Sequence, residues 1–154
     1  MKTTKQYGRK ADTALTMWVK LARAYSVLGH SSAENIRSFG LTEPQFGVLE
    51  TLGHLGPMLT GELSRKRLVS GGNVTVVVDN LLKLGLVERR ICAEDRRQIY
   101  VQLTAKGRRL FEKIFPKHAE FIVSLVGVLT EEEQQELGRL LKKLGLGVQT
   151  AKSS

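Results

Sequence analysis

The stretch from Leu59 to Leu103 constrains the fold more than any other part of this chain. It predicts a short helix, a Ser-Gly-Gly turn, a second helix and a basic hairpin in direct succession. Thr60 can cap the first helix, over about residues 61–68, and Ser70 can cap the second, over 71–84. A helix-turn-helix that leads straight into a hairpin is therefore expected.

The second helix contains Val-Thr-Val-Val-Val, a run that also has strong strand propensity. We predict a helix, because Ser70 stands where a capping residue is needed and Gly85 with Leu86 stands where a helix commonly ends. Helical periodicity then divides the run into an inward and an outward face. The inward face consists of Val74, Val77, Val78, Leu81 and Leu82.

Residues 86–91 and 98–103 are predicted to form the two strands of the hairpin, and residues 92–97 its loop. Every second residue from Ile99 to Leu103 is apolar, so one face of this strand is expected to be buried and the other wet. The expected fold class is mainly α with a small β-hairpin, a winged helix-turn-helix with long terminal helices.

The amino-terminal region is predicted as two helical pieces behind a flexible basic arm, residues 1–10. Asp12 can cap a helix that runs to about Leu28 with apolar residues at helical spacing. A short turn of helix is expected over residues 32–39, because Gly40 would end it.

Two capping boxes mark further helix starts. Thr42 pairs with Gln45 ahead of one helix, and Thr130 pairs with Glu133 ahead of another. The later helix is expected to end at Gly145 and to leave a loose tail. Its leucine stripe consists of Leu137, Leu140, Leu141 and Leu144.

One domain over residues 1–154 is expected, because a hydrophobic content of 42% suffices for a single core. Residues 42–104 would form its winged helix-turn-helix part. Thr104 can cap a long helix that follows the hairpin. The helices within 12–39 and 105–145 have more apolar surface than one small core needs, so they are predicted to be dimerisation helices. The alternative is that the leucine stripe of the last helix closes a core within the chain.

The formal net charge of +9 is unevenly distributed. Residues 1–25 contain six basic and one acidic residue, and residues 59–109 contain eleven basic and five acidic residues. A basic surface confined to part of a chain is typical of proteins that bind polyanions such as nucleic acids. The alternative is that these side chains only keep the protein soluble.

The sequence does not suggest a secreted or membrane protein. No apolar run approaches the ~18 residues that a membrane span needs, and the basic start lacks the apolar segment of a signal peptide. The single cysteine, Cys92, excludes an intrachain disulfide and a zinc site built on several cysteines. We therefore expect a cytoplasmic protein without membrane contact.

The outward face of the second helix offers side chains suited to the major groove. Asn73 could read adenine, Thr75 could hold a phosphate or a base edge, and Val76 could contact a thymine methyl group. Lys83, near the other end, is better placed for the DNA backbone. The candidate DNA-binding residues of this helix and its turn are Ser70, Gly72, Asn73, Thr75, Val76 and Lys83.

The hairpin carries guanidinium groups that can enter a narrow minor groove or bind phosphates. They belong to Arg89, Arg90, Arg96 and Arg97. Asp95 is expected to pair with Arg97, which would brace the wing and leave Arg96 for DNA.

Catalytic and metal sites are not indicated. His30, His54 and His118 lack metal-ligand spacing, no phosphate-binding loop occurs, and no candidate serine has a neighbouring base. Nearby arginines would favour the thiolate of Cys92, so a redox sensor is one interpretation, and a small residue at a strand end is the other. We expect no enzyme activity, no metal and no cofactor.

Two motifs follow each other at the end of the hairpin. Asp95-Arg96-Arg97 is an Asp-x-Arg wing loop, and Leu103-Thr104-Ala105-Lys106-Gly107 is a Leu-Thr-x-x-Gly helix start. With them, about residues 42–112 resemble the MarR family of bacterial transcription regulators. The resemblance implies that the second helix reads the major groove, that a wing arginine reaches the minor groove, and that the terminal helices form a dimer.

We therefore expect a homodimeric regulator, a repressor, that binds a pseudo-palindromic site in double-stranded DNA. If the resemblance extends to ligand control, a small aromatic or amphipathic effector would bind in a cleft lined by Trp18, Tyr25, His30 and Phe46. The alternatives are a regulator that senses redox state through Cys92 and a winged-helix module that binds protein.

Overall fold

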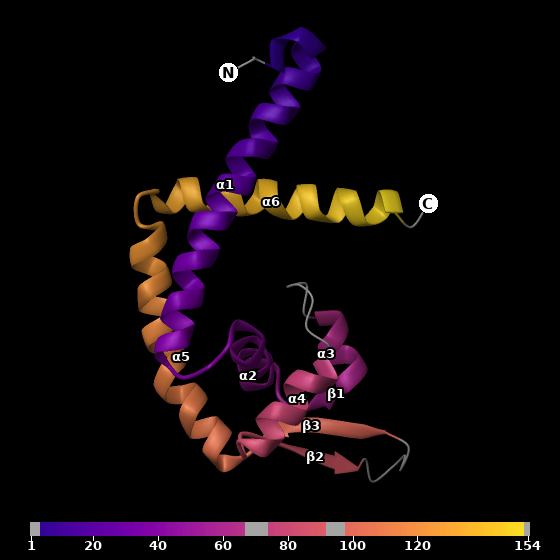
Figure 1. Ribbon diagram of the computed structural model, residues 1–154, viewed down its shortest axis with the longest axis vertical. Helices are drawn as coiled ribbons and strands as arrows, with labels where there is room; N and C mark the ends of the chain where they lie inside the picture. The colour runs from indigo at the N-terminus through magenta and orange to yellow at the C-terminus, as the bar shows by residue number, and fades with distance from the viewer. Residues whose placement is uncertain (1–3, 67–73, 92–97, 153–154) are drawn as a thin grey trace. The chain divides into compact units, whose positions relative to one another are not determined.

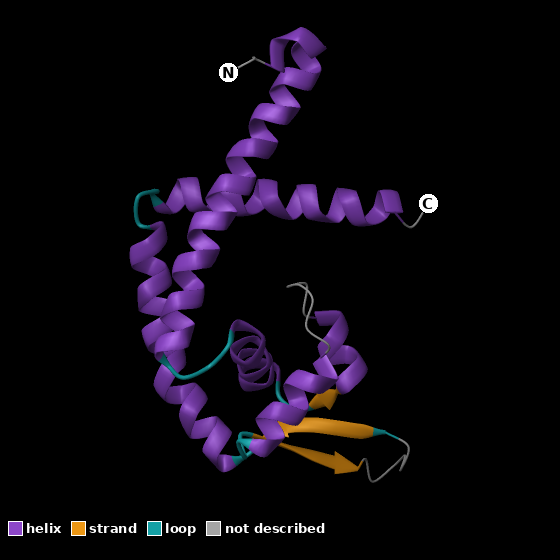
Figure 2. Cartoon of the chain, viewed as in Figure 1, coloured by secondary structure: helices purple, strands orange, loops and turns teal. Residues whose placement is uncertain are grey.

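The computed structural model describes residues 4–66, 74–91 and 98–152 and confirms the expected fold class. The chain is mainly helical with one small antiparallel sheet, as Figure 2 shows. It divides into two compact units, residues 1–118 and 119–154, which are described separately below. Among the described residues, no helix is long and apolar enough to span a membrane.

The elements follow the predicted order, with additions at the amino terminus and in the sheet (Figure 1). They are η1 Thr4–Tyr7, α1 Arg9–Ser38, α2 Glu43–Leu55, β1 Met58–Leu59, α3 Thr60–Lys66, α4 Val74–Lys83, β2 Val87–Ile91, β3 Ile99–Leu103, α5 Ala105–Val126 and α6 Glu131–Lys152.

The amino-terminal region differs from the prediction of a loose arm and two helical pieces. Residues Thr4–Tyr7 form a 3-10 helix, and α1 then continues without a break through Gly29. A glycine inside a helix costs only about 1 kcal/mol relative to alanine. The last turns of α1 bury Ala33 and Ile36 and contact α2, and this packing offsets the weak local propensity.

The capping box at the start of α2 is confirmed. The backbone N–H of Thr42 donates to Oε1 of Gln45 at 2.9 Å, and the backbone N–H of Gln45 donates to Oγ1 of Thr42 at 3.3 Å. Gly56, with a φ of 80°, ends the helix. Four side chains of α2 are buried: Phe46, Val48, Leu49 and Leu52.

The predicted end of α4 is also confirmed. Gly85 adopts a φ of 68°, in the left-handed region that glycine favours. Its N–H donates to the carbonyl oxygen of Leu82 at 2.9 Å, and the N–H of Leu86 donates to that of Leu81, also at 2.9 Å. These two bonds form a Schellman motif. Within α4, Val77, Val78 and Leu81 are buried, which confirms the inward face.

The sheet has three strands in the order β1-β3-β2, all antiparallel. The hairpin strands match the prediction, but β1 was not predicted, since two residues are too short to show alternation. Met58 pairs with Val101, and both side chains are buried. Ile99 was expected to be buried and is 44% exposed, because it lies at the outer end of the hairpin, beyond β1.

The core of the first unit lies where α2, α4 and the sheet meet. The last turns of α1 and the first half of α5 also contribute to it. Its members that are at most 1% exposed are Val48, Leu49, Leu52, Leu63, Val78, Leu81 and Val101.

The second unit contains the end of α5 and all of α6. The predicted capping box is present: the N–H of Thr130 donates to Oε2 of Glu133 at 2.9 Å, and the N–H of Glu133 donates to Oγ1 of Thr130 at 3.3 Å. The predicted stop at Gly145 is wrong, because the helix runs on to Lys152. A glycine ends a helix when it takes a positive φ, and Gly145 does not.

Candidate nucleic-acid interface

The outer face of α4 carries the described part of the predicted reading surface. Val77, Val78 and Leu81 of the inner face are buried. Thr75, Val76 and Lys83 lie on the opposite side and are exposed. The side chain of Val76 is 53% exposed. The candidates Ser70, Gly72 and Asn73 lie outside the described residues.

Arg89 connects strand β2 to this helix. Its Nη2 lies 2.7 Å from Oδ1 of Asp79, and the two side chains are 38% and 44% exposed. From the sequence, Arg89 was predicted only to contact DNA, and no role was predicted for Asp79. The signal was present, since Asp79 is the one acidic residue between Val74 and Lys83.

The other side of β2 holds a second ion pair, because neighbouring residues of a strand point to opposite faces. Nε and Nη2 of Arg90 each lie 3.0 Å from Oε1 of Glu88, and Nε2 of Gln102 on strand β3 donates to the same oxygen at 2.6 Å. The bond from Gln102 and the pair with Arg90 lower the pKa of Glu88. The two arginines of β2 are therefore held on opposite faces of the hairpin.

The tip of the hairpin lies outside the described residues. It contains Cys92, the brace residue Asp95, and the candidates Arg96 and Arg97. The predicted pairing of Asp95 with Arg97 stays a prediction.

The structure does not bring the four predicted effector residues together. Phe46 is a core residue, 4% exposed, whose ring centroid lies 4.7 Å from that of His118. Trp18 and Tyr25 on α1 are 61% and 68% exposed. His30 is also exposed, and its Nε2 lies 3.5 Å from Oε1 of Glu34.

His118 on α5, which the sequence left as one of three scattered histidines, is buried against two other helices. Its Nδ1 lies 2.8 Å from Oδ1 of Asn35 on α1, and its ring contacts Phe46 on α2. Burial lowers the pKa of His118, and the charge of Glu50 acts in the opposite direction.

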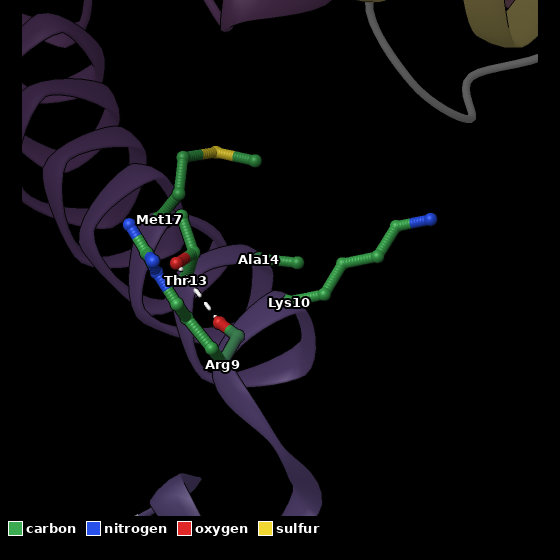
Figure 3. A pocket seen from close by; sticks show the side chains of 5 residues that line it. All are labelled: Arg9, Lys10, Thr13, Ala14 and Met17. Carbon is green, nitrogen blue, oxygen red and sulfur yellow. Dashed lines mark hydrogen bonds between the residues drawn. The ribbon is translucent and has the colours of Figure 1, made fainter.

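A shallow open pocket lies near the start of α1, and none of the predicted effector residues lines it (Figure 3). Its lining side chains come from two successive turns of one helix, so it has no opposing wall. They are Arg9, Lys10, Thr13, Ala14 and Met17. Across the part of the chain that the structure describes, no three histidine, cysteine, aspartate or glutamate side chains are grouped as a metal site would require.

Comparison with known proteins agrees with this geometry. Residues 39–98, which include α2 to α4 and the first hairpin strand, match the model of the MarR family. The HTH-type transcriptional regulator MhqR of Bacillus subtilis is 36% identical over 135 residues, which cover 88% of this chain and 93% of that protein.

Two solved structures show the same fold. A MarR family transcriptional regulator from Streptomyces coelicolor, solved in complex with DNA, has a TM-score of 0.80 at 23% identity and covers 88% of this chain and 87% of its own. BpsR of Bordetella bronchiseptica, whose DNA binding is regulated by 6-hydroxynicotinic acid, has a TM-score of 0.73 at 28% identity, with 81% and 89% covered. Together, the family match, the similarity over nearly the full length and the shared fold show that this chain belongs to the MarR family of transcriptional regulators.

Proposed function

We propose that this protein is a homodimeric repressor that binds a pseudo-palindromic site in double-stranded DNA through α4 and the β2–β3 hairpin. The observation that carries this proposal is the exposed face of α4, which lies beside a strand with two arginines and is tied to it by the pair of Arg89 with Asp79. Such a role would place the protein in the cytoplasm, where bacterial DNA lies.

The dimensions and chemistry of α4 suit the major groove. Ten residues at 1.5 Å each give a helix about 15 Å long, and the groove is about 12 Å wide. Thr75 and Val76 lie near its amino-terminal end, where base edges are closest, and Lys83 lies at the other end, near the backbone. Ser70, Gly72 and Asn73 would extend this surface.

The hairpin would supply contacts to the flanking DNA. Arg90, Arg96 and Arg97 are assigned to phosphates or the minor groove, with Asp95 as the brace. Arg89 has a double role, because a guanidinium group has five N–H donors and its bond to Asp79 uses only some of them. It would orient the hairpin against α4 and still reach a phosphate.

Dimerisation would be required to read two half-sites one DNA turn, about 34 Å, apart. Support comes from the leucine face of α6 (Leu137, Leu140, Leu141 and Leu144), whose members are 40–46% exposed. Large apolar side chains of α1, among them Trp18 and Tyr25, are also exposed. A face of this kind is typical of protein–protein contact, and symmetry would pair it with its own copy.

Release by a small effector is the last part of the proposal. Its support is the regulation of the Bordetella relative by a small aromatic acid. We assign no pocket for such a ligand, because Phe46 is packed in the core while Trp18, Tyr25 and His30 lie exposed on α1.

Selection of duplexes from a random-sequence pool by the purified protein tests DNA binding and half-site spacing together. We expect enrichment of two related half-sites and a steep fall of affinity with salt. Asn73→Ala and Arg96→Ala should weaken binding to the selected duplex by about tenfold each, while Lys113→Met, on the exposed side of α5, should not. No enrichment, or unchanged binding by both alanine variants, would reject this reading surface.

A further inference from the structure

Hydrogen bonds join the end of α4 to the start of α5. The sequence predicted that Thr104 caps α5, but not that it also binds the end of α4. We call it the α4–α5 joint, formed by residues 84–86 and 104–107. Oγ1 of Thr104 donates to the carbonyl oxygen of Gly85 at 2.7 Å and accepts the N–H of Gly107 at 3.0 Å. The hydroxyl that caps α5 is therefore also bound to the end of α4.

Lys106 makes the second side-chain bond of the joint. Its Nζ donates to the carbonyl oxygen of Leu84 at 2.8 Å. The last carbonyl groups of a helix carry partial negative charge and lack partners within the helix. A cation at this position therefore stabilises the end of α4, although Lys106 belongs to another helix.

The backbones of the two segments also meet directly. The N–H of Thr104 donates to the carbonyl oxygen of Leu86 at 3.1 Å. At Gly107 a Cβ atom would lie 1.9 Å from that same oxygen, so a larger residue would force the two backbones apart. This contact explains why the Leu-Thr-x-x-Gly pattern needs glycine at its last position.

We propose that Thr104 and Lys106 are positioning residues that set the direction of α4 by holding the carbonyl groups of Gly85 and Leu84. The buried valines and leucines of α4 fix its rotation about its own axis, but burial of one face of a ten-residue helix restrains its tilt less than its rotation. The joint restrains this tilt at one end. The inference rests on the proposed DNA binding in one respect. A change in the tilt of α4 would move Thr75 and Val76 from their places in the major groove.

Lys106 could instead bind a phosphate of the DNA, and the salt dependence of affinity separates the two roles. A lysine that neutralises a phosphate contributes about one unit to the slope of log affinity against log salt, whereas a positioning residue contributes none. Lys113→Met is the matched control, because it removes the same charge from an exposed position of the same helix.

The binding experiment uses the full-length protein, a duplex selected by the wild type and a mixed-sequence duplex of equal length. Relative to Lys113→Met, we expect Lys106→Met to bind the selected duplex about three- to tenfold more weakly, with the same salt slope and the same affinity for mixed sequence. Lys106→Arg should restore most of the loss. A slope smaller by about one, or no loss against the control, overturns the proposal.

Thr104 is tested with Thr104→Val, which keeps the shape and removes the hydroxyl, and with Thr104→Ser, which keeps the hydroxyl. We expect the valine variant to lose affinity for the selected duplex as Lys106→Met does, and the serine variant to bind within about twofold of wild type. Equal binding by these two variants overturns the role of the hydroxyl.

Hydrogen exchange of the free protein provides a measurement that does not depend on DNA. The amides of Gly85 and Leu86 are bonded within the Schellman motif, and we expect Lys106→Met to raise their exchange rates about threefold or more over Lys113→Met. If Lys106→Met leaves the exchange rates of these two amides unchanged, the positioning role of Lys106 is wrong, whatever the DNA affinities are. If the wild type selects no DNA, the proposed function fails, and the exchange rates still decide whether the joint holds α4.

Discussion

Helices α2 and α6 have the same local design and opposite surroundings. Each begins with a threonine capping box of nearly equal geometry, and each carries a leucine stripe. In α2 the stripe is buried up to the last residue of the helix: Leu49 and Leu52 are at most 1% exposed, and Leu55 at the end is 58% exposed. In α6 the leucine face is 40–46% exposed, and none of its described side chains is buried. The same sequence pattern therefore occurs in a core helix, α2, and in a helix with an uncovered apolar face, α6.

The difference shows what a hydrophobic stripe can and cannot specify. Periodicity and capping determine that a helix forms and which face is apolar, because both act within a few residues. They do not specify what covers that face. For α2 the cover comes from α4 and the sheet of the same chain, whereas for α6 we propose a second copy of the protein.

The largest expected effect tests the buried side of this comparison. Leu49→Ala should lower the free energy of unfolding by about 3 kcal/mol at any protein concentration, because a fully buried leucine leaves a cavity. Leu141→Ala on α6 should have a comparable effect only where the protein is dimeric. Urea denaturation of both variants at several concentrations measures this contrast, and equal, concentration-independent losses would contradict it.

The exposed side of the comparison is tested by the oligomeric state. Leu140→Glu should weaken dimerisation by about 2 kcal/mol, or roughly thirtyfold, since it places a charge in an apolar contact. Sedimentation over a range of concentrations measures the dissociation constant. Lys143→Gln changes the net charge of the same helix equally and should leave it within about threefold. A wild-type protein that stays monomeric would refute the proposed dimer.

The two capping boxes should contribute equally to helix stability, although the two leucine stripes differ in burial. Thr42→Ala and Thr130→Ala should each cost about 1 kcal/mol of helix stability, and serine at either position should restore most of it. Hydrogen exchange in the first turn of each helix reports the local loss. A cap that costs much more in α2 than in α6 would show that burial strengthens the box, and the two helices would no longer share a local design.

The smallest effect concerns pH and the buried histidine of the first unit. Because burial lowers the pKa of His118, the unfolded chain takes up a proton more readily than the folded one. The contribution of His118 to stability is therefore lost as pH falls below 6.5, the ordinary value for histidine. We expect His118→Gln to lose less stability than wild type between pH 7.5 and 5.5 in urea titrations. A steeper loss of stability in the variant would mean that folding raises, and does not lower, the pKa of His118.

Much of the fold followed from short-range signals. Both capping boxes, the stop at Gly85 and the two hairpin strands were predicted correctly, since each depends on residues close in sequence. The predicted stops after Leu28 and at Gly145 were wrong. In α1, packing of the following turns against α2 outweighs a weak propensity, and local sequence contains no record of that packing.

The candidate interface was predictable only in part. The outward face of α4 followed from periodicity, and its exposed residues lie where expected. The pair of Arg89 with Asp79 and the bond of Lys106 to Leu84 join residues 10 and 22 positions apart. Contacts at such separations depend on how α4, the hairpin and α5 meet, which no pattern within one element reveals.

The sequence by itself determined most of the helices, the two hairpin strands, their order and the resemblance to the family, because capping, turn chemistry and motif spacing are local properties of the chain. Only the tertiary structure decided which of these elements are joined. The stretch from Leu59 to Leu103 acquired a third strand from Met58, a salt bridge between its second helix and its hairpin, and a joint to α5. These connections form between distant residues, so they exist only once the core has brought the backbones together.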